Sequence, residues 1–254
     1  ARPFEMAFAV SRPRERLLAT LHALLLSRGG ASNAELHTGE GLEAERQVEL
    51  PSAPLSDLLR HCLKTSDNTY AELLLKHTGK AWQTSHHDSP ADAARAGKRA
   101  IKHVLQHTLG VEPGSFSQGD GSGLSRHTLV STSALTALLK GMWTGTEPAT
   151  RDLFLSCLPI AGTDGTLKRR FQGTAAQGVV FAKTGTLSGV SALSGFLMHD
   201  HFPLIVFSII INGSTQPGAV QRSGIDDIVL LLTRLRTAGC ERASVGAGDA
   251  GGAS

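Results

Sequence analysis

Residues 178–211 read GVVFAKTGTLSGVSALSGFLMHDHFPLIVFSIII, and this stretch decides the fold class of the 254-residue chain. Three apolar segments, 178–183, 190–199 and 202–211, are separated by short groups of turn-forming residues. Runs of this length that are rich in Val, Ile and Phe and bounded by Gly, Ser and Asp are typical of β-strands. The stretch therefore predicts three consecutive antiparallel strands, the last two joined around Asp200 and His201.

Helical patterns lie on both sides of these strands. Apolar residues recur at intervals of three and four, which predicts helices over 11–27, 55–65, 68–79, 89–110, 132–144, 148–158 and 217–236. Helices grouped before and after an antiparallel meander predict an α+β architecture, with the helices flanking the sheet. We expect one domain over residues 1–240, followed by a disordered tail rich in Gly, Ala and Ser over 241–254.

The composition excludes several classes of protein. Apolar residues make up 41% and charged residues 19%, with a formal charge of +3, as in a folded globular protein. Lys and Arg are scattered, so we expect no nucleic-acid partner, and no apolar run is long enough for a transmembrane helix. Cys62 and Cys157 are expected to be small core residues, and His103 and His107 to lie on a solvated helix face, so no metal or cofactor is predicted.

Two triplets carry the chemistry that the sequence indicates. Ser66-Asp67-Asn68 lies in the predicted bend between two helices, and Lys183-Thr184-Gly185 lies where the first predicted strand ends. S-D-N and K-T-G, together with S-x-x-K, are the motifs of penicillin-binding proteins and class A β-lactamases. The two triplets stand in the correct order and in the correct structural context.

These residue types fit acyl transfer, which needs a serine nucleophile, proton relays and donors for the developing oxyanion. The Ser66 hydroxyl can relay a proton, and the Asn68 side chain can orient a substrate amide. Lys183 supplies positive charge and can bias the Ser66 hydroxyl, whereas Thr184 and Thr186 can bind a terminal carboxylate. An extended peptide can pair with the edge of the strand that carries Lys183.

Longer segments around the triplets are also distinctive: residues 55–72, DGSGLSR at 120–126, LPIAGTDGTL at 158–167 and KTGTL at 183–187. With them the chain resembles, over residues 15–238, the low-molecular-mass class C penicillin-binding proteins. These are D-Ala-D-Ala carboxypeptidases and endopeptidases of the S13 peptidase type. The resemblance implies the fold shared by penicillin-binding proteins and serine β-lactamases.

The resemblance also implies a substrate and further site residues. Peptidoglycan stem peptides would be the substrate and β-lactams the acylating inhibitors, which suggests a periplasmic or exported protein, or a plastid protein in a photosynthetic eukaryote. Ser66, Asn68 and Lys183 would be catalytic, and Thr184, Gly185 and Thr186 would bind substrate. The Thr186 N–H would contribute to the oxyanion hole, and Arg126 would meet a carboxylate of the stem peptide.

One departure from the family stands out: no Ser in the chain is followed three residues later by Lys. In the family this motif lies near the N-terminus, separated from S-D-N by a large insertion. We therefore expect that the nucleophile and the first strands of the sheet belong to an upstream part, which leaves the fold incomplete at the N-terminus. Two alternatives stay open: an inactive module of the same fold that binds peptidoglycan or a partner, and a β-lactamase- or esterase-like hydrolase.

Overall fold

The computed structural model describes residues 12–29, 51–86, 92–199 and 202–235. The chain divides into two compact units, 1–51 and 52–254, which we treat separately. In the first, helix α1 (Pro13–Ser27) confirms the predicted helix, although Ser11 lies outside the described residues. Its Leu17, Leu21 and Leu24 are exposed. No described helix has the length and apolar character needed to cross a membrane.

The second unit is organised around the predicted antiparallel meander. Strands β3 (Val180–Leu187), β4 (Val190–His199) and β5 (Phe202–Asn212) follow one another in the order β3-β4-β5. The expected end of the first strand at Lys183 is wrong, because β3 continues to Leu187, which pairs with Val190. The strand turns only at Ser188 and Gly189, and Gly189 has a positive φ of 75°, a conformation that glycine adopts readily.

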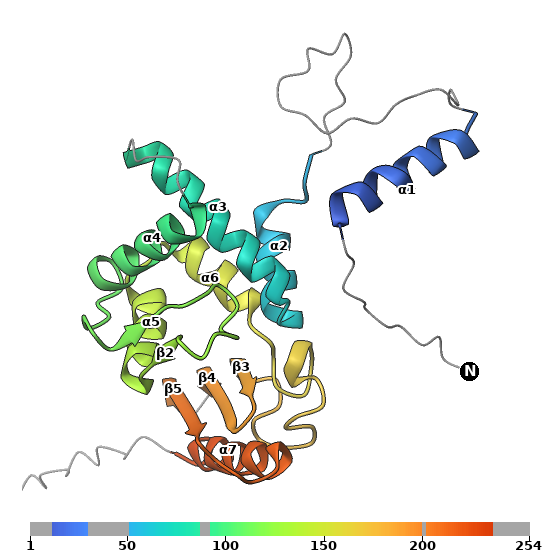
Figure 1. The fold of residues 1–254 in the computed structure, drawn as a ribbon. Helices are drawn as coiled ribbons and strands as arrows, with labels where there is room; N and C mark the ends of the chain where they lie inside the picture. Colours follow the sequence, from blue (N-terminus) through green and yellow to red (C-terminus); the bar gives the residue numbers. More distant parts are fainter. Residues whose placement is uncertain (1–11, 30–50, 87–91, 200–201, 236–254) are drawn as a thin grey trace, which may run out of the picture. The chain divides into compact units, whose positions relative to one another are not determined.

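Helices cover both faces of this sheet, as Figure 1 shows. Leu193 and Leu197 of β4 point to one face and pack in the same cluster as Ile225 and Val229 of α7 (Gly218–Leu232). Phe196 points to the other face, in a cluster with residues of α5 (Thr132–Thr144) and α6 (Pro148–Cys157). The alternation of side chains along one strand therefore produces two cores. Cys62 and Cys157 are buried free thiols, as predicted, and Cys240 lies outside the described residues.

Six further elements complete the part that holds the site. α2 (Leu55–Thr65) lies against α6 and the 3₁₀ helix η1 (Gly165–Leu167), and α3 (Asn68–His86) packs on α4 (Ala93–His107). Strands β1 (Phe116–Ser117) and β2 (Leu129–Val130) form a small separate sheet. The predicted tail over 241–254 and the predicted helix start at Ser89 and Pro90 lie outside the described residues.

The predicted end of α3 at Gly79 is wrong, since the helix continues to His86. Gly79 lies where α4 crosses, and a Cβ atom there would stand 1.8 Å from the Ala93 carbonyl oxygen. Across the contact, a Cβ at Gly97 would stand 2.1 Å from the Leu75 carbonyl oxygen. The two glycines allow the helix backbones to approach closely, and this tertiary contact overrides the low helix propensity of glycine.

Gly79→Ala should destabilise the chain, because backbone atoms rather than a movable side chain occupy the space that the methyl needs. We expect the free energy of unfolding, measured by urea denaturation, to fall by at least ~2 kcal/mol. Gly224→Ala in α7 is the matched control, since a Cβ there meets nothing within 4 Å. That variant should be neutral or more stable by up to ~1 kcal/mol. Equal losses in the two variants would contradict this account of the helix contact.

Candidate active site

The Ser66-Asp67-Asn68 motif forms the predicted bend between α2 and α3. Ser66 adopts left-handed backbone angles (φ 59°, ψ 49°), which are unfavourable for a residue other than glycine. Asp67 stabilises the bend: its N–H donates to the Cys62 carbonyl oxygen at 3.1 Å, and its Oδ1 accepts the Tyr70 N–H at 3.0 Å. The Tyr70 N–H lowers the pKa of the Asp67 carboxyl. Asp67 is thus structural, and it leaves the flanking Ser66 and Asn68 exposed.

Lys183 joins the second motif to the first. Its Nζ donates to Ser66 Oγ at 2.7 Å and to the Thr184 carbonyl oxygen at 2.9 Å. Partial burial lowers the pKa of the Lys183 amine, an effect that the Cys62 thiol opposes. An ammonium that donates to Ser66 Oγ leaves the hydroxyl proton of that serine directed elsewhere, where a reacting group can take it. Two motifs that are 117 residues apart therefore form one polar centre.

Within the described residues, no strand pairs with the outer edge of β3 beside this centre. Val180 O accepts the Ala161 N–H and the Ala182 N–H donates to Pro159 O, both at 2.9 Å. The backbone N–H and C=O groups of the even-numbered residues of β3 are therefore directed away from β4. Thr184 and Thr186 continue this alternation beyond the part that residues 159–161 cover. Gly185, in contrast, is directed towards Ala192 of β4. Apart from the Thr184 carbonyl oxygen, which accepts from Lys183 Nζ, the backbone groups of Thr184 and Thr186 on this edge can pair with an extended peptide.

The sequence did not identify a partner for Thr184, but the structure provides one. Thr184 Oγ1 lies 2.9 Å from Thr166 Oγ1, which belongs to η1. Both hydroxyls are close to the open strand edge, and either can act as the donor. The LPIAGTDGTL segment therefore reaches the site through Thr166, and the signal that could have indicated this was the inclusion of Thr166 in that distinctive segment.

The loop that carries Arg126 is organised by Asp120. Its carboxylate accepts hydrogen bonds from Ser122 Oγ, Gly123 N–H, Ser125 N–H and Thr128 Oγ1. Burial opposes ionisation, but these donors, Thr128 first, lower the pKa of the Asp120 carboxyl. The DGSGLSR segment is thus a loop folded around one carboxylate.

Glu72 fixes this loop to α3. Its Oε1 accepts the N–H groups of Gly121 and Ser122 at 3.0 and 2.9 Å. Glu72 lies four residues after Asn68, so both side chains occur on the same side of the helix. Arg126 is exposed and makes no hydrogen bond or ion pair with the described residues. Its role as a carboxylate-binding residue stays a prediction.

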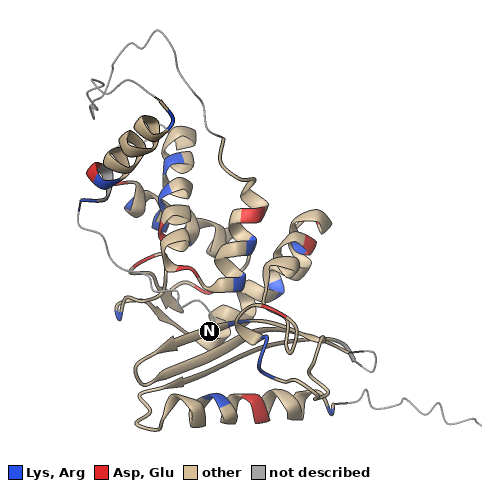
Figure 2. Ribbon diagram, turned by 90° about the vertical axis from the view of Figure 1, so that its right-hand side faces the viewer, with Lys and Arg blue, Asp and Glu red and all other residues tan. Residues whose placement is uncertain are grey.

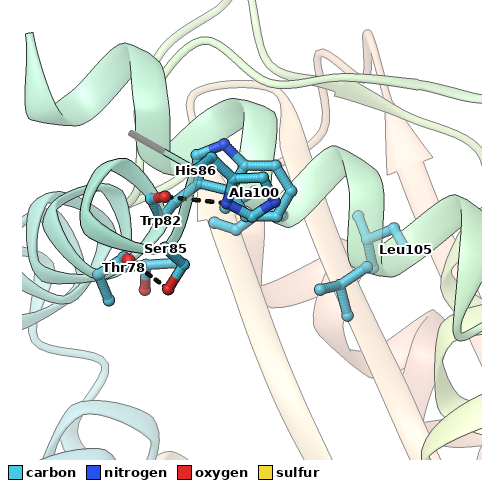
Figure 3. Close-up of a pocket in the computed structure, with 9 residues that line it drawn as sticks. Thr78, Trp82, Ser85, His86, Ala100 and Leu105 are labelled. Atoms are coloured by element: carbon cyan, nitrogen blue, oxygen red, sulfur yellow. Dashed lines mark hydrogen bonds between the residues drawn. The ribbon is translucent and has the colours of Figure 1, made fainter. Parts of the chain in front are cut away.

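One cavity in the described part of the chain lies away from these motifs. It has a volume of about 470 Å³ and lies between α3 and α4 (Figure 3). Trp82 and His86 in its wall are stacked, with ring centroids 3.7 Å apart. None of its lining residues belongs to the motifs, so the candidate active site is the open edge of β3 and not this cavity.

The described residues show neither a basic stripe nor a cluster of metal-ligating side chains. Basic side chains are spread over several helices and interspersed with acidic ones, rather than gathered in one stripe (Figure 2). Among the described residues no three His, Cys, Asp or Glu side chains converge on a potential metal position. His103 and His107 are exposed, with ring centroids 4.6 Å apart.

The position of Lys183 predicts an altered titration. Because burial lowers its pKa, the amine should lose its proton below about 10.4, the ordinary value for lysine. Nζ-detected NMR of the chain, with the Lys183 signal assigned from its loss in Lys183→Arg, measures the midpoint. In Ser66→Ala the midpoint should change, because the hydroxyl that accepts from the amine is gone. A midpoint at or above the ordinary value would contradict the described surroundings of this amine.

The Asp120 loop predicts a pH-dependent loss of stability. Folding lowers the pKa of this carboxyl, so its contribution is present above about pH 3.9 and is lost as the pH falls through the folded-state pKa. Asp120→Asn should therefore lower the free energy of unfolding by about 1–3 kcal/mol at pH 7, and by less at pH 3. The exposed Asp227→Asn in α7 is the control and should change it by less than ~0.5 kcal/mol. A pH-independent difference would exclude the carboxylate as its cause.

Comparison with known proteins shows the family of the chain. A family model described as D-Ala-D-Ala carboxypeptidase 3 (S13) matches residues 1–235. The chain is 33% identical over 229 residues to penicillin-sensitive carboxypeptidase A of Dictyostelium discoideum, covering 87% of this chain and 42% of that protein. It is 39% identical over 180 residues to a D-alanyl-D-alanine carboxypeptidase of Actinomadura, covering 69% and 31%. The chain thus spans less than half the length of these relatives.

Solved structures show the same fold. Penicillin binding protein 4 of Haemophilus influenzae, complexed with a β-lactam, aligns with a TM-score of 0.72 and 29% identity, over 91% of this chain and 53% of that one. An extended-spectrum β-lactamase aligns with a TM-score of 0.51 at 16% identity, over 69% of this chain and 63% of that one. The expected fold of penicillin-binding proteins and serine β-lactamases is confirmed.

Proposed function

Since the chain belongs to the S13 family of D-Ala-D-Ala carboxypeptidases, we propose that its site acts in the hydrolysis of peptidoglycan stem peptides through an acyl-serine intermediate. The bond cleaved would be the terminal D-Ala-D-Ala peptide bond or a crosslink formed by a D-amino acid. The observation that carries this proposal is the hydrogen bond from Lys183 Nζ to Ser66 Oγ beside an open strand edge. The nucleophile and its lysine are assigned to an S-x-x-K motif that these 254 residues do not contain.

Ser66 and Lys183 would carry out the proton transfers of the acylation step. Attack by the nucleophilic serine forms a C–O bond and breaks the C–N bond of the substrate, so the departing D-Ala amine needs a proton. The Ser66 hydroxyl can supply it and in exchange take up the proton that the nucleophilic serine loses, while the Lys183 ammonium stabilises negative charge that develops on Ser66 Oγ during the relay. Water then hydrolyses the acyl-serine and releases the shortened peptide.

The substrate would lie along β3 as an added strand. Its terminal carboxylate would meet the positive charge of Lys183 and the Thr184 hydroxyl, and the Thr186 N–H would donate to the oxyanion. The Asn68 amide, exposed at the start of α3, would orient the substrate amide. Arg126, on its loop against the same helix, would bind a second carboxylate of the stem peptide.

β-Lactams would acylate the same nucleophile. The Haemophilus influenzae relative has been solved with a β-lactam bound, and the fold is shared with a β-lactamase. We also propose that the protein is exported, or lies in a plastid in a photosynthetic eukaryote, because its substrate would be cell-wall material. The absence of S-x-x-K from these residues favours one second candidate, a non-catalytic module that binds stem peptides through the same strand edge.

Labelling by a fluorescent penicillin tests the proposal. We expect covalent labelling of the protein produced from its complete coding sequence and none of the 254-residue chain alone. Lys183→Ala should slow the labelling about 10²- to 10⁴-fold, since it removes the charge beside Ser66. Lys80→Ala, on the exposed side of α3, is the control and should label at the wild-type rate.

Either of two results would overturn the acyl-serine proposal. One is the absence of labelling in the complete protein, and the other is an unchanged rate in Lys183→Ala. In the first case, binding of D-Ala-D-Ala peptides without turnover would support the non-catalytic module. Rapid hydrolytic turnover of a chromogenic β-lactam, instead of slow trapping, would assign the site to a β-lactamase.

A further inference from the structure

We propose that Lys64 and Asp164 are positioning residues whose ion pair sets the place of Ser66 relative to Lys183, and through it the rate of acylation. This inference rests on the proposed function. Neither residue belongs to the motifs that carry the chemistry. Their role follows from how the S-D-N bend and strand β3, which each carry part of the site, are connected to each other.

The two halves come from different layers of the fold. Ser66 and Asn68 lie at the junction of α2 and α3, whereas Lys183, Thr184 and Thr186 lie on β3. Within the described residues, a single direct hydrogen bond, from Lys183 Nζ to Ser66 Oγ, joins the bend to the strand. An exposed serine held by one bond would shift easily when substrate enters. A second connection is therefore needed to keep the 2.7 Å contact.

Lys64 supplies the first part of this connection. It lies in the last turn of α2, two residues before Ser66, and its Nζ donates to Asp164 Oδ2 and to the Leu158 carbonyl oxygen, both at 2.6 Å. The Lys64 and Asp164 side chains are 16% and 38% exposed, so the ammonium is largely removed from water. Asp164 Oδ1 also accepts the Ile160 N–H at 2.8 Å. The Lys64 ammonium thus fixes both ends of the turn 158–164 to α2, through the hydrogen bond to Leu158 and the ion pair with Asp164.

The same turn is fixed to β3. Pro159 O accepts the Ala182 N–H at 2.9 Å, and Thr166 Oγ1 lies 2.9 Å from Thr184 Oγ1. These contacts are made by the residues on either side of Lys183. Hydrogen bonds and the covalent chain together form a closed ring. Hydrogen bonds join Ser66 to Lys183, Ala182 to Pro159 and Leu158 to Lys64, and the chain connects the remaining neighbours.

Gly165 shows how closely the turn and α2 approach. It has a positive φ of 55°, and a Cβ atom there would lie 2.8 Å from the Lys64 carbonyl oxygen. Loss of either charged partner would leave the other as an unpaired, partly desolvated charge, so the turn would move away from α2. A displacement of about 1 Å at a catalytic group can cost about 10²-fold in rate.

The test compares acylation rates of the protein from its complete coding sequence. We expect Lys64→Met and Asp164→Asn each to slow acylation by a fluorescent penicillin about 10- to 100-fold. The double variant should be no slower than the slower single variant, since both remove one connection. Asp164→Asn retains the volume and an acceptor for the Ile160 N–H, so it stays informative if Lys64→Met does not fold.

The matched controls are Arg170→Met and Asp226→Asn. They break an ion pair of similar burial, with side chains 15% and 25% exposed, that joins the segment after η1 to α7. These variants should lower the melting temperature but leave the acylation rate within about twofold of the wild type. With a D-Ala-D-Ala peptide, the Lys64 and Asp164 variants should lower kcat more than they raise KM, because neither side chain is placed against substrate.

The inference fails if the wild type is acylated and the Lys64 and Asp164 variants slow no more than the controls; the proposed function then stands. If the wild type is not acylated, the proposed function fails and the positioning is tested in the 254-residue chain. There the NMR titration midpoint of Lys183 should move in Lys64→Met and stay in place in Arg170→Met. An unmoved midpoint in Lys64→Met would overturn the positioning role in that case.

Discussion

The short contact between the Lys183 amine and the Ser66 hydroxyl depends on a strand that is held from both sides. β4 pairs with β3 along its whole length, and residues 159–161 pair with its first half. The pairing with residues 159–161 ends just before Lys183. The Lys183 backbone is therefore fixed, while the strand edge that follows it is open. The rest of the site takes its position from that boundary between a covered and an uncovered edge.

The site contains two features that cost free energy on their own. Ser66 has a left-handed backbone, and the Lys183 ammonium is partly removed from water. Such features persist only where surrounding contacts over-determine them. Here those contacts are the Asp67 hydrogen bonds that fix the bend and the pairing on both sides of β3. The strained backbone of Ser66 and the partly buried amine of Lys183 thus belong to two residues in direct contact. Such a combination is common where a group must donate or accept a proton.

Local patterns in the sequence predicted the main helices and strands well, but they could not predict how these elements pack against one another. The meander, the S-D-N bend and the helices around it follow from hydrophobic periodicity and turn residues. Gly79 was misinterpreted because its partner, α4, is distant in sequence, and close helix contact reverses the usual meaning of a glycine. Lys64 and Asp164 are 100 residues apart, and common charged residues give no signal of pairing at that separation. Only Glu72, one helical turn after Asn68, had a position that spacing could have indicated.

The hairpin at Ser188 and Gly189 restricts how this segment can change in evolution. Side chains of a strand alternate between faces, so Val180 and Ala182 enter the core beneath α7 while Lys183 points to the opposite face. A deletion of one residue between Lys183 and the turn would exchange these faces and direct an amine into fully buried apolar surroundings. Single substitutions between Lys183 and the turn leave the alternation of faces intact, whereas an insertion or deletion of one residue reverses it. Among homologues this stretch should therefore align without gaps, even where identity between the sequences is low.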